Sequence, residues 1–280
     1  DLYGSPGSFM DKRDGKSYKT IKIGGMEWMA ENLAYKPEEG NFWTYKSLEK
    51  YGYLYDFSTA QKACPEGWHL PAKSEFKSLL SFYEGQTDPH KLLMKEDTGF
   101  AVLLSGYRYY IENQFWNSDW AEQARFWSST TIENTILAWC LNLDFFHVEL
   151  FYGPQQSGYS VRCVKGQKQF PEAEIKIPDD FKPFWEKFQS VISEGKKEEM
   201  IKICNNQQMI EYINVFLFEE FTAEDLKNAI LNTGPSEIIV LSKNRTLFLY
   251  VIDKDIGTYK AVEFGKTDGD WGIERYSSVE

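Results

Sequence analysis

A short polar and aromatic segment near the middle of the chain combines side chains that suit ligand binding. Asn117, Asp119 and Glu122 offer oxygen atoms of the hard kind that calcium prefers. Trp116 and Trp120 flank them with rings on which the apolar face of a sugar can stack. These five residues form our candidate ligand-binding site. The alternative is that the rings and amides pack together and hydrogen-bond the loop to itself.

The four cysteines do not suggest catalysis or zinc binding. Cys64, Cys140, Cys163 and Cys204 match neither a paired zinc spacing nor a redox C-x-x-C motif. Their number is compatible with two disulfides, one disulfide or none. Cys140 lies alone in an alternating strand pattern, so we expect a small buried hydrophobic residue. A reactive thiolate would need a neighbouring thiol or base. We interpret Cys204 in the same way.

No other pattern points to an enzyme. The three histidines, His69, His90 and His147, are far apart and lack metal-ligand spacing, so we expect no metal site. We expect the ring of His69 to be packed and hydrogen-bonded to backbone. The sequence contains no Gly-x-Ser-x-Gly elbow, phosphate loop or dinucleotide fingerprint. We therefore predict no catalytic residues, no cofactor and no enzymatic activity.

Charge and hydropathy exclude two classes of protein. The 280 residues carry a net charge of −11, and the basic residues are spread along the chain, which argues against nucleic-acid binding. Apolar runs such as 247–252 are far shorter than the ~20 residues of a membrane-spanning helix. The sequence begins at Asp1 without an initiator Met, so we expect a trimmed form whose export signal has been removed.

Tryptophan usage divides the chain into two predicted domains. Seven of the nine tryptophans precede Lys165. The stretch from Gly166 to Pro178 contains loop-forming Gly and Pro residues. We therefore predict one domain at 1–168, a join, and a second domain at 178–280.

The first domain is expected to mix short strands, helices and long loops. A strand over 18–23 turns at Gly24-Gly25, and Ser58 is the expected cap of a helix through Ala63. Helical spacing predicts a second helix that ends at Gly85, and Asp88-Pro89 predicts a short third helix. The apolar face of the second helix contains Phe76, Leu79, Leu80 and Tyr83. From Gly99 onward the pattern indicates short strands and long loops.

The second domain is expected to place helices before an antiparallel sheet, so the whole chain is predicted to be α+β. Apolar residues at helical spacing predict a helix from Phe181, capped by Asp179 or Asp180. The segment 222–225 resembles a capping box that opens a later helix. Four strands are predicted at 238–241, 245–252, 259–264 and 271–276, with a hairpin turn at Asp268-Gly269.

Seven short motifs, in order between residues 11 and 165, carry a resemblance to a known family. They are Asp14-Gly-Lys-Ser-Tyr-Lys-Thr-Ile-Lys-Ile-Gly24, Trp28-Met-Ala-Glu-Asn-Leu33, Tyr51-Gly-Tyr-Leu-Tyr55, Ala63-Cys-Pro-Glu-Gly-Trp-His-Leu-Pro71, Ser105-Gly-Tyr-Arg108, Phe126-Trp-Ser-Ser-Thr130 and Gly158-Tyr-Ser-Val-Arg-Cys-Val-Lys165. With them the first domain resembles the Fibrobacter succinogenes major paralogous domain, a bacterial extracellular family related to the C-type-lectin and sulfatase-modifying-factor fold. The resemblance implies an extracytoplasmic location, a mixed fold with two flanking helices, and no assigned reaction.

The same resemblance implies a disulfide between Cys64 and Cys163, with Cys140 and Cys204 as free thiols. The alternative is that both residues are reduced and packed. C-type lectins that bind sugar through calcium use a Glu-Pro-Asn or Gln-Pro-Asp loop and a Trp-Asn-Asp strand, and neither pattern occurs here. We therefore expect no tight calcium site.

The second domain resembles the nuclear-transport-factor-like cone fold. The resemblance rests on Phe181-Lys-Pro-Phe-Trp-Glu-Lys-Phe188, Glu194-Gly-Lys-Lys-Glu-Glu-Met200 and Phe264-Gly-Lys-Thr-Asp-Gly-Asp-Trp271. Such cones serve as enzymes, ligand pockets or interaction modules, so the fold selects none of these functions.

The sequence leaves two main hypotheses for the function. The first is a non-catalytic interaction protein that is secreted or held at the cell surface. Lipid anchoring through the removed N-terminal signal is one way to hold it there. Its partner would be a protein or a cell-surface glycan. The alternative is a calcium-independent carbohydrate-binding protein that uses the aromatic loop residues. A third and weaker hypothesis is a small-ligand pocket inside the cone, unless Phe184, Trp185 and Phe188 fill it.

Overall fold

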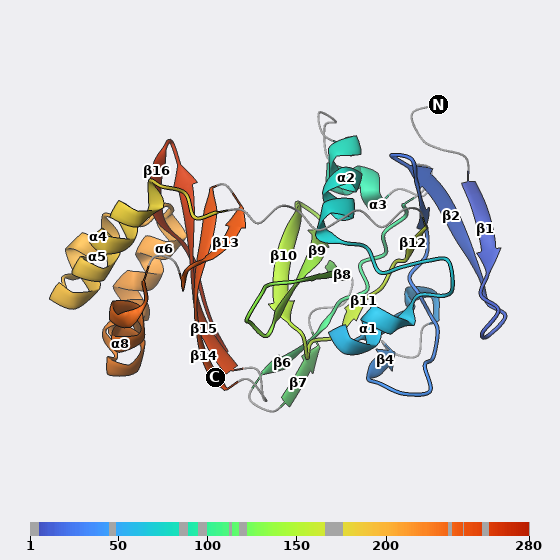
Figure 1. Cartoon of the computed structure of the whole chain (residues 1–280), viewed down its shortest axis with the longest axis horizontal. Coiled ribbons are helices and arrows are strands. Elements are labelled where there is room, and N and C mark those ends of the chain that lie inside the picture. The colour runs from blue at the N-terminus through green and yellow to red at the C-terminus, as the bar shows by residue number, and fades with distance from the viewer. Residues whose placement is uncertain are drawn as a thin grey trace. The chain divides into compact units, whose positions relative to one another are not determined.

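The chain folds as an α+β protein that divides into two compact units (Figure 1). The computed structural model describes residues 6–44, 49–83, 89–94, 100–111, 114–117, 122–165, 176–234, 237–242, 244–253 and 258–279. The first unit is Asp1–Pro171 and the second is Glu172–Glu280. Each unit is described by itself.

The described residues of the first unit form two larger sheets and a hairpin. One sheet is antiparallel, in the order β1 (Pro6–Met10), β2 (Ser17–Ile23), β3 (Met26–Met29) and β12 (Val164–Lys165). The other has the order β10 (Val148–Pro154), β9 (Leu137–Asp144), β8 (Gln123–Thr131), β11 (Tyr159–Ser160), β5 (Tyr53–Tyr55) and β4 (Phe42–Thr44). Within it β11 runs parallel to β8, so the sheet is mixed. The hairpin joins β6 (Arg108–Ile111) to β7 (Gln114–Asn117).

In the described part of this unit, three α-helices and a short 3-10 helix, η1 (Glu49–Tyr51), accompany these sheets. The α-helices are α1 (Phe57–Ala63), α2 (Lys73–Tyr83) and α3 (Pro89–Met94), at the predicted places. Helix α2 buries three of the four residues of its predicted apolar face. The predicted cap of α1 is wrong: the carboxylate of Asp56, not Ser58, accepts the backbone N–H of Thr59 at 2.8 Å. Asp56 precedes the first helical residue with extended backbone, whereas Ser58 already lies within the first turn.

The β8–β9–β10 part of the mixed sheet has two different faces because side chains alternate along each strand. One face packs its apolar residues against α2. The register aligns Arg125 with Asn142 and Asn142 with Glu149, so these three residues share the other face. That second face carries Arg125, whose surroundings are described below.

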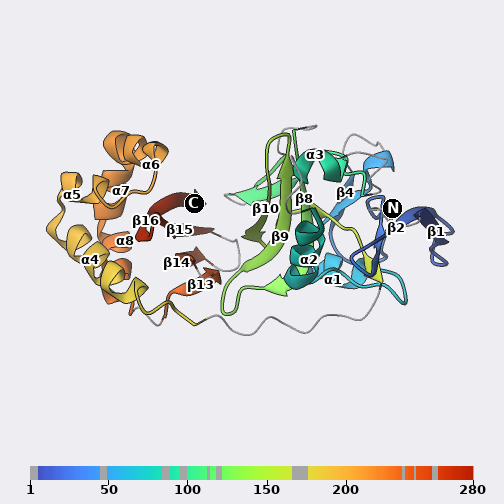
Figure 2. The ribbon, with the colours of Figure 1, turned by 90° about the horizontal axis from the view of Figure 1, so that it is seen from above.

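The second unit is built from helices followed by one antiparallel sheet. Its helical segments are α4 (Phe181–Glu194), α5 (Lys197–Ile201), α6 (Gln207–Tyr212), the π-helix η2 (Ile213–Leu217), α7 (Phe218–Thr222) and α8 (Glu224–Asn232). Its sheet has the order β13 (Ile239–Ser242), β14 (Arg245–Asp253), β15 (Thr258–Thr267) and β16 (Asp270–Val279). Figure 2 shows the helices gathered on one side of this sheet. The turn between β15 and β16 is Asp268-Gly269, as predicted.

Two predicted helix caps in this unit differ from the structure. Asp180 occupies the N-cap position of α4, but its side chain makes no capping hydrogen bond. Its carboxylate binds Lys266 and accepts the indole N–H of Trp271 at 3.1 Å. The predicted capping box is also wrong. Thr222 ends α7, where its hydroxyl donates to the carbonyl of Phe218 at 2.8 Å.

The interior of the second unit is filled by apolar side chains. Phe184, Trp185 and Phe188 belong to one buried core cluster, in which Trp185 and Phe188 are fully buried. This packing weighs against the hypothesis of a small-ligand pocket lined by these residues. No helix in the described part of the chain is long and apolar enough to cross a membrane.

Candidate functional site

The five residues of the predicted ligand-binding site are described only in part. Trp116 and Asn117 lie on β7, where the backbone alone is described, and Asp119 and Trp120 fall outside the described residues. Glu122 is exposed and immediately precedes β8. Their assembly into one site therefore stays a prediction. The hairpin register does place Trp116 opposite Tyr109 of β6.

Arg125 of β8 is the centre of a polar and aromatic cluster next to that segment. Its Nε donates to Asn142 Oδ1 at 3.2 Å, and its Nη1 donates to the hydroxyl of Tyr159 at 3.2 Å. The guanidinium carbon lies 3.8 Å from the ring centre of Tyr107 and 4.9 Å from that of Phe151. Cation–π contacts of this kind stabilise a charge that water does not fully solvate. We call these five residues the Arg125 cluster.

A buried thiol lies beneath the cluster. Cys140 faces the same way as Asn142, two residues further along β9, and it is completely buried. Burial raises the pKa of its thiol to about 12, although the charge of Arg125 acts in the opposite direction. The thiol is therefore protonated at neutral pH and is a poor nucleophile. This agrees with the interpretation of Cys140 as a packed residue.

The turn between β9 and β10 exposes two aromatic side chains. Phe146 is 75% exposed and Phe145 is 49% exposed. The turn is fixed, because the backbone N–H of Asp144 donates to the carbonyl of His147 and Asp144 Oδ1 accepts the N–H groups of Phe146 and His147, both at 2.7 Å. Asp144, the last residue of β9, pairs with Gln123, the first residue of β8. The turn therefore lies at the same end of these strands as Glu122.

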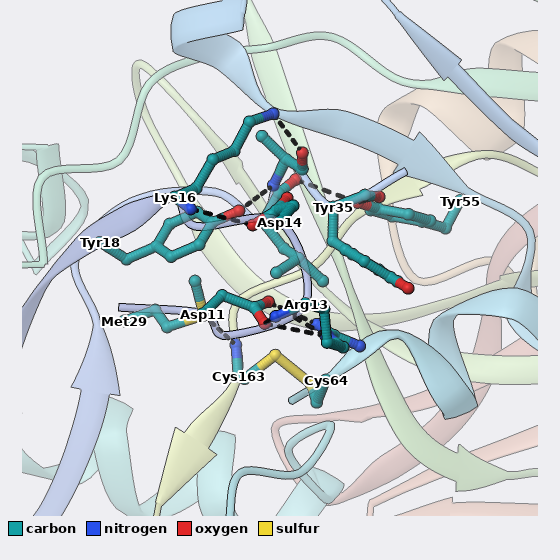
Figure 3. Close-up of polar contacts among 12 residues, drawn as sticks. Asp11, Arg13, Asp14, Lys16, Tyr18, Met29, Tyr35, Tyr55, Cys64 and Cys163 are labelled. Atoms are coloured by element: carbon teal, nitrogen blue, oxygen red, sulfur yellow. Dashed lines mark hydrogen bonds and ion pairs between the residues drawn. A yellow bond between two sulfur atoms is a disulfide. The ribbon is translucent and has the colours of Figure 1, made fainter. Parts of the chain in front are cut away.

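The disulfide implied by the resemblance is present. Cys64, at the C-terminus of α1, is bonded to Cys163, and their Cα atoms are 5.8 Å apart. Cys140 and Cys204 are free. The backbone N–H of Cys163 also points at the sulfur of Met29, at 3.4 Å (Figure 3).

A second polar cluster lies in the loop between β1 and β2, and Figure 3 shows its members. Arg13 donates to both carboxylate oxygens of the buried Asp11, and its guanidinium lies 3.6 Å from the ring centre of Tyr35. Burial raises the pKa of Tyr18 to about 12, and its hydroxyl accepts the N–H of Ala34. These charges and hydroxyls are satisfied by protein partners, so the cluster stabilises the loop.

The structure describes the side chains of two of the three histidines, His69 and His147. His69 Nε2 shares a hydrogen bond of 2.8 Å with Glu75 Oε1, so the expectation of a backbone partner for the ring is wrong. It is the backbone of His69, not its ring, that pairs with Val164. His147 contacts Asp144 at 3.5 Å and is exposed. Among the described residues no group of three or more His, Cys, Asp or Glu side chains is arranged to hold a metal ion.

Neither Arg125 nor the Phe145-Phe146 turn was among the predicted site residues. The alternation along β8 predicts a shared face for Arg125 and Trp127, but it does not indicate the partner strands. The Phe-Phe pair between Asp144 and His147 was a usable signal, because turn positions are normally polar.

The comparison with protein-family models agrees with the motifs. No curated protein and no solved structure matches the chain. The family model of the Fibrobacter succinogenes major domain matches residues 21–165, a segment that contains α1, α2, the Arg125 cluster and both cysteines of the disulfide. Because this match covers more than half of its length, the chain belongs to the Fibrobacter succinogenes major domain family.

Proposed function

We propose that the protein is a non-catalytic binding protein, secreted or held at the cell surface, whose first unit contacts a protein or surface partner. The exposed Phe145-Phe146 turn carries this proposal. The two rings are adjacent and largely exposed, and a partner that covered them would remove their apolar surface from water. The turn is held by three hydrogen bonds, so little conformational entropy is lost when a partner binds it.

The disulfide supports the extracytoplasmic part of the proposal. Bonds of this kind persist in oxidising compartments and are rare in the reducing cytosol. The chemistry of the described thiols supports the non-catalytic part. Burial raises the pKa of Cys204 to about 11, and Cys140 is similarly protonated, so neither thiol is activated.

Site-specific crosslinking tests the contact surface. A photoreactive amino acid replaces Phe146 in the protein displayed on its own cells, and a matched control places the same group at the exposed Lys36. We expect a discrete crosslinked product from position 146 alone. Phe145→Ser/Phe146→Ser should abolish retention of the protein by the partner and leave the thermal midpoint unchanged. Equal products from both positions, or none from 146, would contradict the proposal.

A specific observation also favours carbohydrate binding without calcium. Arg125, Tyr107 and Tyr109 are partly exposed, and the two tyrosine rings lie 5.8 Å apart. Partly exposed rings beside polar groups are suited to the mixed surface of a sugar. Calorimetric titration tests whether calcium is needed. Sugar binding should persist in the presence of EDTA. A micromolar calcium site at Asn117, Asp119 and Glu122 would contradict binding without calcium.

A further inference from the structure

Arg125 carries a positive charge that no carboxylate neutralises in the described part of the chain. No Asp or Glu oxygen lies within 4 Å of its guanidinium there, and its hydrogen-bond partners are an amide and a phenol. Glu149 shares the same face of the sheet, but Asn142 stands between the two residues in the register. A partly buried guanidinium loses part of its hydration. Without an anion beside it, its charge therefore lowers the stability of the folded protein, and a bound anionic ligand would offset that loss.

The groups around Arg125 do not supply that anion. Burial raises the pKa of Tyr159 to about 12, so its hydroxyl stays neutral at physiological pH. The thiol of Cys140 stays neutral for the same reason. The cation is therefore surrounded by aromatic rings and neutral dipoles alone, among the residues whose placement is known.

The guanidinium also keeps donors available. Arginine has five N–H groups, and the hydrogen bonds of Arg125 involve only Nε and Nη1. Nη2 donates to no atom of the described residues. Arg162 provides a contrast within the same unit. It is fully buried, but its Nε, Nη1 and Nη2 donate to Asn32, Phe100 and Ala101 respectively, which is the pattern of a structural arginine.

The walls of the cluster fit a ring-shaped ligand. Tyr107 lies 3.8 Å from the guanidinium, and Tyr109 continues the aromatic surface toward the β6–β7 hairpin. Both rings are partly exposed, so they can pack against the C–H face of a pyranose. The amide of Asn142 adds a polar group at the base of the cluster.

We propose that Arg125 binds the carboxylate of an acidic saccharide, a uronic-acid unit whose ring packs on Tyr107 and Tyr109. The free Nη2 edge supplies the charge-assisted hydrogen bonds, and planar guanidinium is the group that best matches carboxylate geometry. This inference deepens the carbohydrate-binding function proposed above and rests on it. It names the class of ligand and the residue that selects it.

A matched pair of saccharides tests the inference. The probes are the trimer of galacturonic acid and the same trimer with every carboxylate methyl-esterified, both titrated into the full-length protein by calorimetry. We expect the acid to bind and the ester to bind at least about tenfold more weakly. Arg125→Gln should remove this preference. Arg125→Lys keeps the charge and loses the planar fork, so it should retain only part of the affinity.

A second variant separates a local effect from general electrostatics. Lys62→Gln removes one positive charge from an exposed site on α1 and should leave binding unchanged. Thermal melting of each variant checks folding. If Arg125→Gln fails to fold, the acid-to-ester ratio of Arg125→Lys decides, because a charge-selective site must still prefer the acid.

The outcomes distinguish this inference from the broader function. Equal binding of acid and ester overturns the charge-selective site but preserves carbohydrate binding. No binding of either probe, or acid binding that Arg125→Gln leaves intact, also overturns the inference. The crosslinking at position 146 is independent of both results, since it reports on the Phe145-Phe146 turn.

Discussion

Asp11 illustrates how single residues in this protein carry charge in buried places. Burial by itself would raise the pKa of this carboxyl, but hydrogen bonds from Arg13 outweigh it and lower the pKa below its ordinary value. A group whose pKa is lower in the folded state stabilises the fold fully above its unfolded pKa. That stabilisation is lost as the pH falls through the folded pKa.

Asp11→Asn should therefore lower the free energy of unfolding at pH 7 and have less effect in acid. The expected loss at pH 7 is about 1 kcal/mol, at the low end for a charged hydrogen bond because Arg13 is 27% exposed. Urea unfolding at pH 7 and below the ordinary Asp range, near pH ~2.5, measures the difference. Glu39→Gln is the control, since it removes the same charge from an exposed site outside this cluster. Equal losses at both pH values would reject the argument.

The disulfide gives a second prediction at this scale. Unfolded, unreduced protein should expose two reactive thiols, those of Cys140 and Cys204. Reduction should raise the number to four, because Cys64 and Cys163 are then released. Replacing the bonded pair by alanine should lower the free energy of unfolding by about 2 to 5 kcal/mol, since the bond closes a loop of 99 residues. Four thiols before reduction would contradict the bond.

Several residue roles depended on distant partners and were beyond reach of the sequence. The pairing of Cys64 with Cys163 was implied by the family resemblance, not by the spacing, and it is confirmed. Asp180 was assigned to capping because the first turn of α4 lies directly after it. Its real partners, Lys266 and Trp271, are on β15 and β16, and local preference cannot anticipate them.

At the scale of elements, strong periodicity was sufficient. Helix α2 and the four strands of the second unit follow their patterns, because apolar residues recur at 3.6 or 2 residues and are buried on one face. The segment 207–222 was not predicted as helix. Its π-helix η2 contains Ile213, Val215 and Leu217, which recur every two residues, and this spacing does not predict a helix.

The β15–β16 turn gives a prediction for an element. Asp268 and Gly269 have φ values of 52° and 97°, a conformation that glycine adopts without steric cost. Gly269→Ala should lower the free energy of unfolding of the second unit by about 1 to 2 kcal/mol through backbone strain alone. Nothing lies within 4 Å of the added Cβ, so crowding plays no part.

Asp268→Gly is the matched control for that turn. It places the permissive residue at the other left-handed position and should cost less than Gly269→Ala. Chemical unfolding followed by the fluorescence of Trp185 and Trp271 in a separately expressed 172–280 fragment would compare them, once circular dichroism shows that the fragment folds. A larger loss from Asp268→Gly would mean that side-chain contacts, not backbone strain, stabilise the turn.

At the scale of the whole molecule, each unit has a core of its own. Among the described residues, the core cluster of the second unit contains none before Ile177, and the two clusters of the first unit contain none after Val164. The backbone divides between Pro171 and Glu172, within the stretch where tryptophan usage changes. Separate cores predict that each unit folds without residues from the other.

Limited proteolysis should therefore cut the chain between residues 166 and 178 and leave two folded fragments. The fragments should separate on a sizing column in native buffer, and each should keep the circular dichroism expected of its own helices and strands. Reductant should destabilise only the N-terminal fragment, because both bonded cysteines belong to it. A chain that resists cleavage there and unfolds in one transition, with reductant lowering the stability of all 280 residues together, would show a single cooperative unit instead.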